Sequence, residues 1–312
     1  ATLNPDFSQI EADDAQISIN DNFTLTLEEK RPFFLENQDI FSSNYDLVYT
    51  RNISAPNAGL KVTGRNGKHA YGVFMTDDDT TTLFIPGNLG SKALEFNQSS
   101  NNAALRYRYD ANKDFNVGFL STIRTSDNYH NYVGSTDFRY KITDQDILKA
   151  QIIFTDTQYP DFIKNKFCDE DADCEQDNIE CTLSDCITSE AYLRTRATDS
   201  FGGHALRVEY NHESRHHFYE FRYQEIGSGY RSDLGNQTRV DQNRLLLEAG
   251  LNFYGDNENW WNKIQAWSNW DILRNDEREV LENEWEFVFE IRGALQSHIY
   301  LSYIKRDKVG VR

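Results

Sequence analysis

The sequence predicts an all-β protein, namely an antiparallel up-and-down transmembrane β-barrel, whole or partial, with a docked N-terminal segment. Three observations predict this fold. From about residue 59 onward, apolar and polar residues alternate with a period of two in segment after segment. These segments are about 8 to 12 residues long, close to the length with which a tilted strand crosses a bilayer. Tight polar turns alternate with long loops, as they do between the two rims of a barrel.

The composition narrows the class of protein. The net charge of -18 over 312 residues argues against a nucleic-acid partner, which would require a basic face. Aromatic residues make up 13% of the chain, as expected for strand-rich proteins and for the aromatic girdles of membrane barrels. No apolar run approaches the roughly 20 residues of a spanning helix. The opening residues do not form a signal peptide, so we expect a mature product or part of a longer protein.

Residues 1–58 are predicted to form a docked or plug-like segment. Its stretch 28–37 places four charged residues directly before an apolar run and one acidic residue after it. The apolar groups would stay wet on a free surface, whereas ions buried without partners cost several kcal/mol each. We therefore expect the aromatic residues to pack inward and the ions to pair with one another or with a charged wall. The predicted docking residues are Glu29, Lys30, Arg31, Phe33, Phe34 and Glu36.

Residues 59–312 are predicted to form the barrel region. Leu105, Tyr107 and Tyr109 share one face of a strand, while Arg106 and Arg108 take the other. The same alternation recurs in the segments 137–142, 148–154, 206–210, 219–223, 244–253 and 284–291. In a soluble sandwich the charged face of each strand would be exposed to bulk water. In a membrane barrel it would line a wet lumen, with the apolar face on lipid.

The connections support the same prediction. The segments 65–68, 110–114, 143–146 and 292–294 read as tight turns, and the first contains Asn66-Gly67, a strong hairpin signal. The segments 77–102, 156–189 and 227–240 read as long loops. We therefore expect the short turns at one rim of the barrel and the longer loops at the other.

The acidic loop 156–189 contains all four cysteines, which are Cys168, Cys174, Cys181 and Cys186. This clustering predicts two local disulfides and an oxidising compartment, and three pairings stay open. Zinc is the alternative, although the spacing lacks the usual CxxC knuckle.

Calcium is the candidate cofactor, and no other is expected. Asp169, Asp171 and Asp173 alternate in the acidic loop as carboxylate ligands do in calcium loops. The glycine and the final glutamate of an EF-hand are missing from this spacing. A solvated acidic loop tip is the alternative.

Catalytic motifs are not found. The sequence contains no G-x-S-x-G, H-E-x-x-H or glycine-rich phosphate loop. With 50 acidic residues, carboxylate pairs suited to glycoside hydrolysis carry almost no information. We therefore expect a protein without enzymatic activity and assign no catalytic residue. An all-β hydrolase that cleaves glycans through an unlocated carboxylate pair is one alternative, and a soluble carbohydrate-binding β-sandwich is the other.

Several stretches resemble a known family. They are NPDFSQIEAD at 4–13, EEKRPFFLEN at 28–37, AGLKVTGRNG at 58–67 and YRYDANKDFNVGFLSTIRT at 107–125. Together they resemble the bacterial family called domain of unknown function 5916. In that family a domain like a carbohydrate-binding module usually precedes a region predicted to form an outer-membrane β-barrel. The resemblance implies no catalytic residue.

The residue patterns and the family resemblance lead to the same expectation about function. We expect a protein of the outer membrane of a Gram-negative bacterium, in contact with outer-membrane lipid. It would pass a solute or bind one at the surface, with a glycan or another small solute as its partner.

Overall fold

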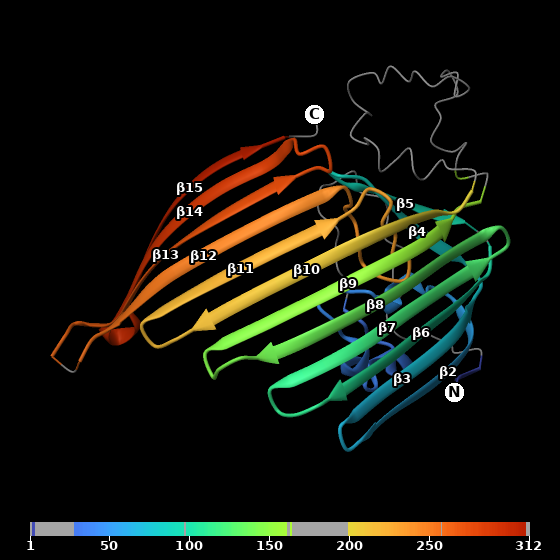
Figure 1. Ribbon diagram of the computed structural model, residues 1–312, viewed down its shortest axis with the longest axis horizontal. Coiled ribbons are helices and arrows are strands. Elements are labelled where there is room, and N and C mark those ends of the chain that lie inside the picture. The colour runs from blue at the N-terminus through green and yellow to red at the C-terminus, as the bar shows by residue number, and fades with distance from the viewer. Residues whose placement is uncertain are drawn as a thin grey trace.

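The computed structural model describes residues 2–3, 28–96, 98–160, 163, 199–256 and 258–309. One antiparallel sheet of thirteen strands dominates it (Figure 1). In spatial order its strands are β1 (Thr2–Leu3), β2 (Pro56–Asn66), β3 (His69–Asp78), β6 (Ser100–Asp110), β7 (Phe115–Ser126), β8 (Tyr129–Lys141), β9 (Asp146–Gln158), β10 (Phe201–Glu213), β11 (His217–Ile226), β12 (Gln242–Tyr254), β13 (Trp261–Arg274), β14 (Val280–Gly293) and β15 (His298–Lys308). A separate hairpin, β4 (Thr81–Pro86) and β5 (Ser91–Phe96), lies in the connection from β3 to β6.

The order of the strands confirms the predicted all-β, up-and-down arrangement. Apart from the β4–β5 hairpin, each strand of the sheet pairs with the strands that precede and follow it in the chain. The strands are also long, with 13 residues in β8 and β9 and 14 in β13 and β14. A tilted strand needs about 9 to 11 residues to cross a bilayer. Within the described residues no pairing joins β15 to β2, so the sheet is open at that seam.

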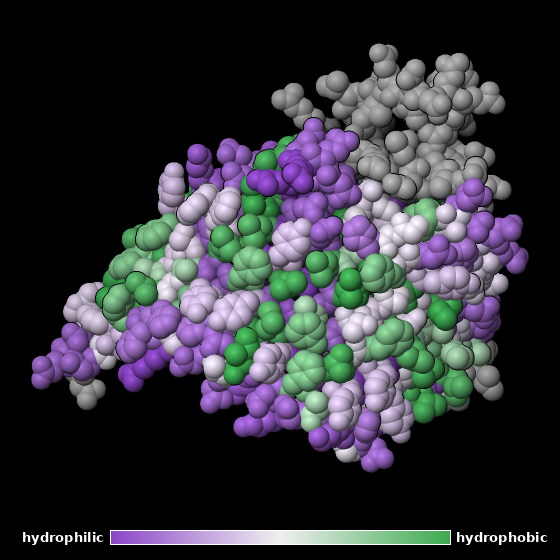
Figure 2. Space-filling model, in the orientation of Figure 1, coloured by the Kyte–Doolittle hydropathy of each residue, from purple (hydrophilic) through white to green (hydrophobic). Residues whose placement is uncertain are grey.

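The two faces of the sheet differ in polarity, and the apolar face is the exposed one. Along β6, Leu105 and Tyr107 are 43% and 41% exposed, whereas Arg106 between them is 3% exposed. The register carries this alternation across the sheet, because Tyr107 lies opposite Tyr71 on one side and Phe119 on the other. We call this exposed side the outer face. Figure 2 views it and shows apolar side chains over the middle of the strands and polar ones toward both ends.

The connections differ between the two rims, as predicted. The connections that follow β2, β6, β8, β10, β12 and β14 are short and lie at one rim. The connections after β3, β9 and β11 are longer and start from the opposite rim, where those after β7 and β13 are short. This is the asymmetry of a barrel with short turns on one side.

Two segments pack against the inner face, opposite the outer one. The first is residues 28–55, called the docked segment, which contains α1 (Pro32–Leu35), η1 (Gln38–Phe41) and η2 (Thr50–Asn52). The second is residues 227–241, the inserted loop, which connects β11 to β12. Figure 1 shows the docked segment behind the strands. The remaining short helix, η3 (Ala294–Gln296), forms part of the β14–β15 turn.

Buried apolar clusters hold both segments in place. One joins Tyr45 and Leu47 of the docked segment to inward residues of β7, β8, β9 and β10 and to Tyr230 of the inserted loop. A second joins the docked segment to Phe74 on β3 and Ala104 on β6. The core of the molecule therefore lies between the inner face and these two segments.

Candidate site on the inner face

Arg31 organises the beginning of the docked segment. Its side chain is 4% exposed, and its guanidinium donates to the carbonyl oxygens of Ile53 at 2.6 Å and Thr50 at 2.7 Å. The same guanidinium forms a two-point pair with Glu29, through Nε to Oε1 at 2.8 Å and NH2 to Oε2 at 2.7 Å. A planar guanidinium fits a carboxylate and carbonyl groups together, which an ammonium cannot do. Arg31 thus joins the two ends of the docked segment.

The surroundings of Glu29 keep its carboxylate charged, so that it can pair with Arg31. Thr50 Oγ1 donates to its Oε2 at 2.5 Å. Burial acts to raise the pKa of Glu29, but the hydrogen bonds from Arg31 and Thr50 and the charge of Arg31 outweigh it. The pKa of Glu29 therefore lies below its ordinary value, and the carboxylate is charged at neutral pH.

The aromatic part of the segment packs on the sheet. Phe34 is 3% exposed and meets Phe74 of β3 edge-to-face, with ring centroids 6.1 Å apart. Phe41 meets the same ring at 5.3 Å. Arg31 lies over Phe34, with its guanidinium carbon 4.5 Å from the ring centroid. Burying each of these aromatic side chains contributes about 1.5 to 3 kcal/mol.

The other predicted docking residues lie at the edge of this packing. Phe33 is half-buried, and Lys30 and Glu36 are exposed. The backbone here is held from the sheet, because Lys61 Nζ on β2 donates to the carbonyl oxygens of Phe33 at 3.0 Å and Phe34 at 3.1 Å, and also to that of Glu36. Lys61 therefore caps the C-terminal end of α1, where carbonyls lack helical partners.

Polar side chains of the sheet hold the middle of the docked segment. The Tyr45 amide donates to Oε1 of Gln151 on β9 at 2.9 Å, and the Tyr45 hydroxyl donates to the Leu206 carbonyl at 3.1 Å. Arg207 on β10 donates to the carbonyl of Asn44 at 3.0 Å. The inner face thus supplies donors and acceptors that fit the backbone lying on it.

The inserted loop locks onto the docked segment. The Tyr49 amide donates to the Leu234 carbonyl at 2.8 Å, and the Asn236 amide donates to the Asp46 carbonyl at 3.0 Å. Asn52 Nδ2 donates to the carbonyl of Gly235 at 2.7 Å. The two segments form one connected body inside the sheet.

Asp233 anchors the inserted loop to the sheet. Its carboxylate accepts hydrogen bonds from the hydroxyl groups of Tyr129 at 2.8 Å and Tyr159 at 3.0 Å. Burial raises the pKa of Asp233, although the two hydroxyl groups and the nearby charges of Arg124 and Arg231 oppose that rise. Arg124 on β7 is fully buried and donates to the Asp233 carbonyl at 3.1 Å.

Beyond the docked segment, charged side chains line the inner face. Glu209 on β10 pairs with Lys149 on β9 at 2.9 Å, with Arg207 at 2.8 Å and with Arg222 on β11 at 3.5 Å. On β14, Glu286 accepts a hydrogen bond from Asn269 Nδ2 of β13 at 3.0 Å. This wall is polar and carries both signs of charge, as a wet lumen does.

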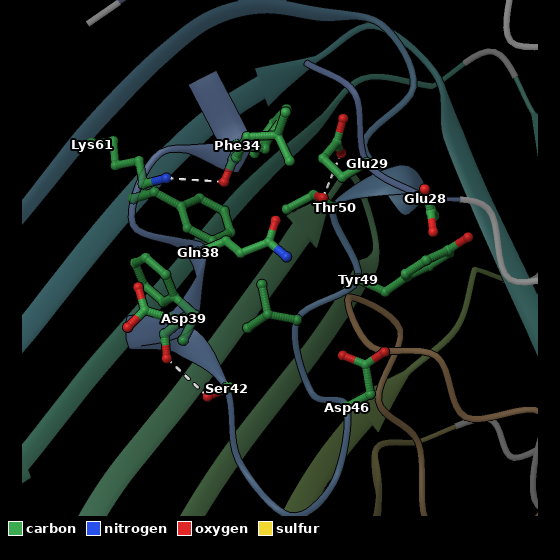
Figure 3. A pocket seen from close by; sticks show the side chains of 14 residues that line it. Glu28, Glu29, Phe34, Gln38, Asp39, Ser42, Asp46, Tyr49, Thr50 and Lys61 are labelled. Atoms are coloured by element: carbon green, nitrogen blue, oxygen red, sulfur yellow. Dashed lines mark hydrogen bonds between the residues drawn. The ribbon is translucent and has the colours of Figure 1, made fainter. Parts of the chain in front are cut away.

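A cavity of about 610 Å³ opens within the docked segment. Figure 3 shows Glu28, Tyr49 and Asp46 along one side of it and Gln38 and Asp39 along the other. Its apolar lining comes from Leu35, Val48 and the rings of Phe34, Phe41 and Phe74. This volume lies within the range of small-molecule sites, about 300 to 1,000 Å³.

The remaining predicted site residues fall elsewhere. Asp169, Asp171 and Asp173, and the four cysteines Cys168, Cys174, Cys181 and Cys186, lie outside the described residues. Calcium binding and the disulfides therefore stay predictions. Within the described ranges, no group of three or more His, Cys, Asp or Glu side chains is placed to hold a metal ion.

The inserted loop is the part of the site that the sequence did not predict. The stretch 227–240 reads as an ordinary long connection rich in Gly, Asn and Asp. One signal was present, since Tyr230, Arg231 and Leu234 place large side chains in that connection. All three are fully buried in the structure.

A model of the family described as domain of unknown function (DUF5916) matches residues 1–67. The predicted resemblance is confirmed over that stretch, which includes the docked segment and β2. No protein of curated function is significantly similar in sequence to the chain.

Solved outer-membrane β-barrels resemble the sheet at low identity. OccAB2 of Acinetobacter baumannii is 11% identical with a TM-score of 0.39, and the alignment covers 80% of this chain and 61% of that one. BamA of Haemophilus ducreyi lacking POTRA domains 1–3 is 8% identical with a TM-score of 0.37, covering 80% and 57%. The toluene transporter TodX of Pseudomonas putida is 9% identical with a TM-score of 0.28, covering 79% and 76%.

These likenesses do not decide the function of this chain, because all three TM-scores lie below 0.5. The chain spans about three fifths of the length of the first two structures. None of the described helices is both long and apolar enough to span a membrane.

Proposed function

We propose that this protein is a bacterial outer-membrane β-barrel protein that passes a polar solute through its lumen or binds one there. The observation that carries this proposal is the inverted polarity of the sheet. Its apolar face is exposed, with Phe119 and Phe287 44% and 54% exposed, while Arg106 and Arg124 on the opposite face are buried. An aqueous solvent would favour the reverse arrangement, and a lipid solvent favours this one.

The docked segment and the inserted loop give the proposed lumen a gate. They fill the space against β3 and β6 to β10, and hydrogen bonds join them to each other and to the wall. The rest of the inner face carries charged side chains. Passage of a solute then requires either a path beside the two segments or their displacement.

The two alternative functions receive less support. A soluble carbohydrate-binding sandwich would bury the apolar faces of two sheets against each other, whereas this apolar face is open. A glycan hydrolase requires two carboxyl groups about 5 to 10 Å apart in a cleft. Four carboxylates line the cavity, of which those of Glu29 and Asp39 are engaged by Arg31 and Arg65, while Glu28 and Asp46 are exposed. Carbohydrate as the solute stays a prediction.

The conductance of the protein in planar bilayers tests this proposal. We expect the full chain to conduct weakly and the double variant Arg31→Ala/Phe34→Ala to show larger or more frequent openings, because two anchors at the beginning of the docked segment are lost. The control is Glu36→Ala, since Glu36 is exposed and its side chain forms no hydrogen bond or ion pair within the described residues. A protein that does not enter the bilayer, or a double variant that conducts like the full chain, would contradict the proposal.

A further inference from the structure

Two cations lie directly opposite each other on the inner face. They are Arg139 on β8 and Lys149 on β9, which are partners in the register of the two strands. Both belong to the inner face, because they lie two positions from Asp137 and Gln151, whose side chains are buried there. Like charges directly opposite each other destabilise a sheet. An anion beside them would remove that cost.

The two cations differ in their partners. Lys149 pairs with Glu209 on β10 at 2.9 Å. Arg139 is half-buried, and its guanidinium has neither a hydrogen bond nor an ion pair within the described residues. Asn116, which lies opposite Arg139 on β7, likewise has no side-chain hydrogen bond in that part of the chain. Arg139, Lys149 and Asn116 are together called the basic patch.

The carboxylate beside the basic patch is shared among several cations. Glu209 pairs with Arg207 at 2.8 Å and with Arg222 at 3.5 Å, in addition to Lys149. The Nε atoms of Arg207 and Arg222 are buried and have no hydrogen-bond partner among the described residues. Arg222 also pairs with Glu220 on its own strand. This part of the wall therefore contains more hydrogen-bond donors than acceptors.

Two carboxylates on the other side of Arg139 are also engaged. Asp137, on the same strand, pairs with Arg106, with NH2 3.0 Å from Oδ2. Asp110, at the end of β6, pairs with Arg108 at 3.1 Å. Arg139 is thus left with a charged group that offers five N–H donors and has no acceptor. The protein carries a net charge of -18, so an excess of positive charge at this place does not follow from its composition.

The basic patch borders the docked segment. Arg207 donates to the carbonyl of Asn44 at 3.0 Å, and Asn44 Nδ2 donates to the carbonyl of Ala150, the residue after Lys149, at 3.4 Å. Arg139 and Lys149 lie next to this contact, on the side of the short β8–β9 turn. The Lys149 side chain is 34% exposed, so a molecule in the lumen can reach it.

We propose that the basic patch binds the anionic group of a solute, namely a carboxylate or a phosphate. The Arg139 guanidinium would donate two parallel hydrogen bonds to this group, which its planar fork favours. Lys149 would add a second positive charge, and the Asn116 amide would add a neutral donor. Because the patch is on the inner face, the anion is a solute of the lumen and not a lipid headgroup. The inference rests on the proposed function, since it specifies the solute as an anion.

Binding to the folded full chain in detergent micelles tests the inference without any need for conductance. We would titrate the protein by calorimetry with inorganic phosphate, with succinate and with succinamide, the uncharged analogue of succinate. Low ionic strength is required, because salt screens the attraction. We expect at least one of the two anions to bind more tightly than succinamide, and the tighter of the two identifies the anionic group.

The variant Arg139→Gln is expected to weaken anion binding about tenfold, because it removes a charge-assisted, two-point hydrogen bond. Arg139→Lys, which keeps the charge and loses the fork, should retain part of the affinity. Arg306→Gln is the matched control, since it removes the same charge from the inner face at β15, where Arg306 pairs with Glu284. Heat-dependent mobility on a gel shows that each variant is folded.

Three outcomes would overturn the inference. Equal affinity for succinate, phosphate and succinamide would mean that the wall does not select for negative charge. An equal loss of affinity in Arg139→Gln and Arg306→Gln, or no loss in Arg139→Gln, would place the anion elsewhere. The absence of anion binding by folded protein would leave the basic patch without this role. None of these results depends on conductance in a bilayer, so failure here and failure of the proposed function are distinguishable.

Discussion

Arg106 and Asp137 illustrate how single residues adapt the inner face. Arg106 on β6 reaches across β7 to pair with Asp137 on β8, with NH2 3.0 Å from Oδ2. Gly118 on β7 makes room for this, because a Cβ at that position would lie 2.6 Å from the guanidinium. The pair is nearly buried, with side-chain exposures of 3% and 10%. Arg106 and Asp137 are therefore paired with each other rather than with solvent.

The Arg106→Met variant is expected to lower the free energy of unfolding by about 3 to 5 kcal/mol, because it leaves the Asp137 carboxylate buried without its partner. Urea unfolding followed by tryptophan fluorescence would measure the change. The double variant Arg106→Met/Asp137→Leu should recover part of the loss. As a control, Arg65→Met breaks the exposed pair with Asp39 and should cost no more than about 1 kcal/mol. Equal losses for Arg106→Met and Arg65→Met would contradict the role of the buried pair.

At the level of residues, the sequence predicts which face a strand residue takes but not what it meets there. The alternation in 104–109 places Arg106 opposite to Leu105 and Tyr107, as the structure does. That Arg106 pairs with Asp137, 31 positions away, depends on the register of three strands. A period of two excludes a register slip of one residue but not of two, so the geometry of the turns must decide which residues lie opposite each other.

The docked segment is the element whose stability should depend on pH. The folded-state pKa of Glu29 lies below its ordinary value of 4.5. Its charged form therefore stabilises the docked segment at pH values above 4.5, and that contribution is lost as the pH falls through the lowered pKa. Protonation weakens the pair with Arg31 and thus the link between Arg31 and η2.

Amide hydrogen exchange of residues 31–53, corrected for intrinsic rates, would measure this. We expect protection in the wild type to be constant above about pH 4.5 and to fall as the pH drops below that value. Glu29→Gln should show reduced protection already at pH 6 and a smaller change with pH. A Glu29→Gln variant with the same pH profile as the wild type would contradict the assignment to Glu29.

At the level of elements, the sequence predicts that the segment 28–37 docks, but it does not predict that the inserted loop packs against the docked segment. The juxtaposition of charge and aromatic bulk in that stretch identifies groups that require both burial and pairing. Arg31 and Phe34 lie buried in the structure, whereas Lys30 and Glu36 lie exposed, a division that composition alone does not reveal. The inserted loop escapes prediction because its anchors Tyr129, Tyr159 and Arg124 belong to other strands and connections.

At the level of the whole molecule, the alternation along strands and the alternation of the rims lead to the same architecture. The sequence predicts long antiparallel strands in up-and-down order with an apolar face, and the sheet has them. What the sequence could not supply is the environment of that face, since a sandwich and a barrel share the same period of two. The exposure of the apolar residues in the folded chain is what separates the two.

The accessibility of two neighbouring residues on β14 tests this claim most directly. Phe287 lies on the outer face and is 54% exposed, while Glu286 lies on the inner face. Single variants Phe287→Cys and Glu286→Cys would be made in a background in which the four native cysteines are serine. They would be folded into lipid vesicles and treated with a membrane-impermeant thiol reagent on both sides of the bilayer, with heat-dependent gel mobility as the control for folding.

We expect the thiol at position 286 to react and the thiol at 287 to be protected until the protein is unfolded, because lipid covers the outer face and water fills the lumen. Equal reaction of the two thiols in the folded protein would mean that the apolar face meets water, and would contradict the membrane assignment.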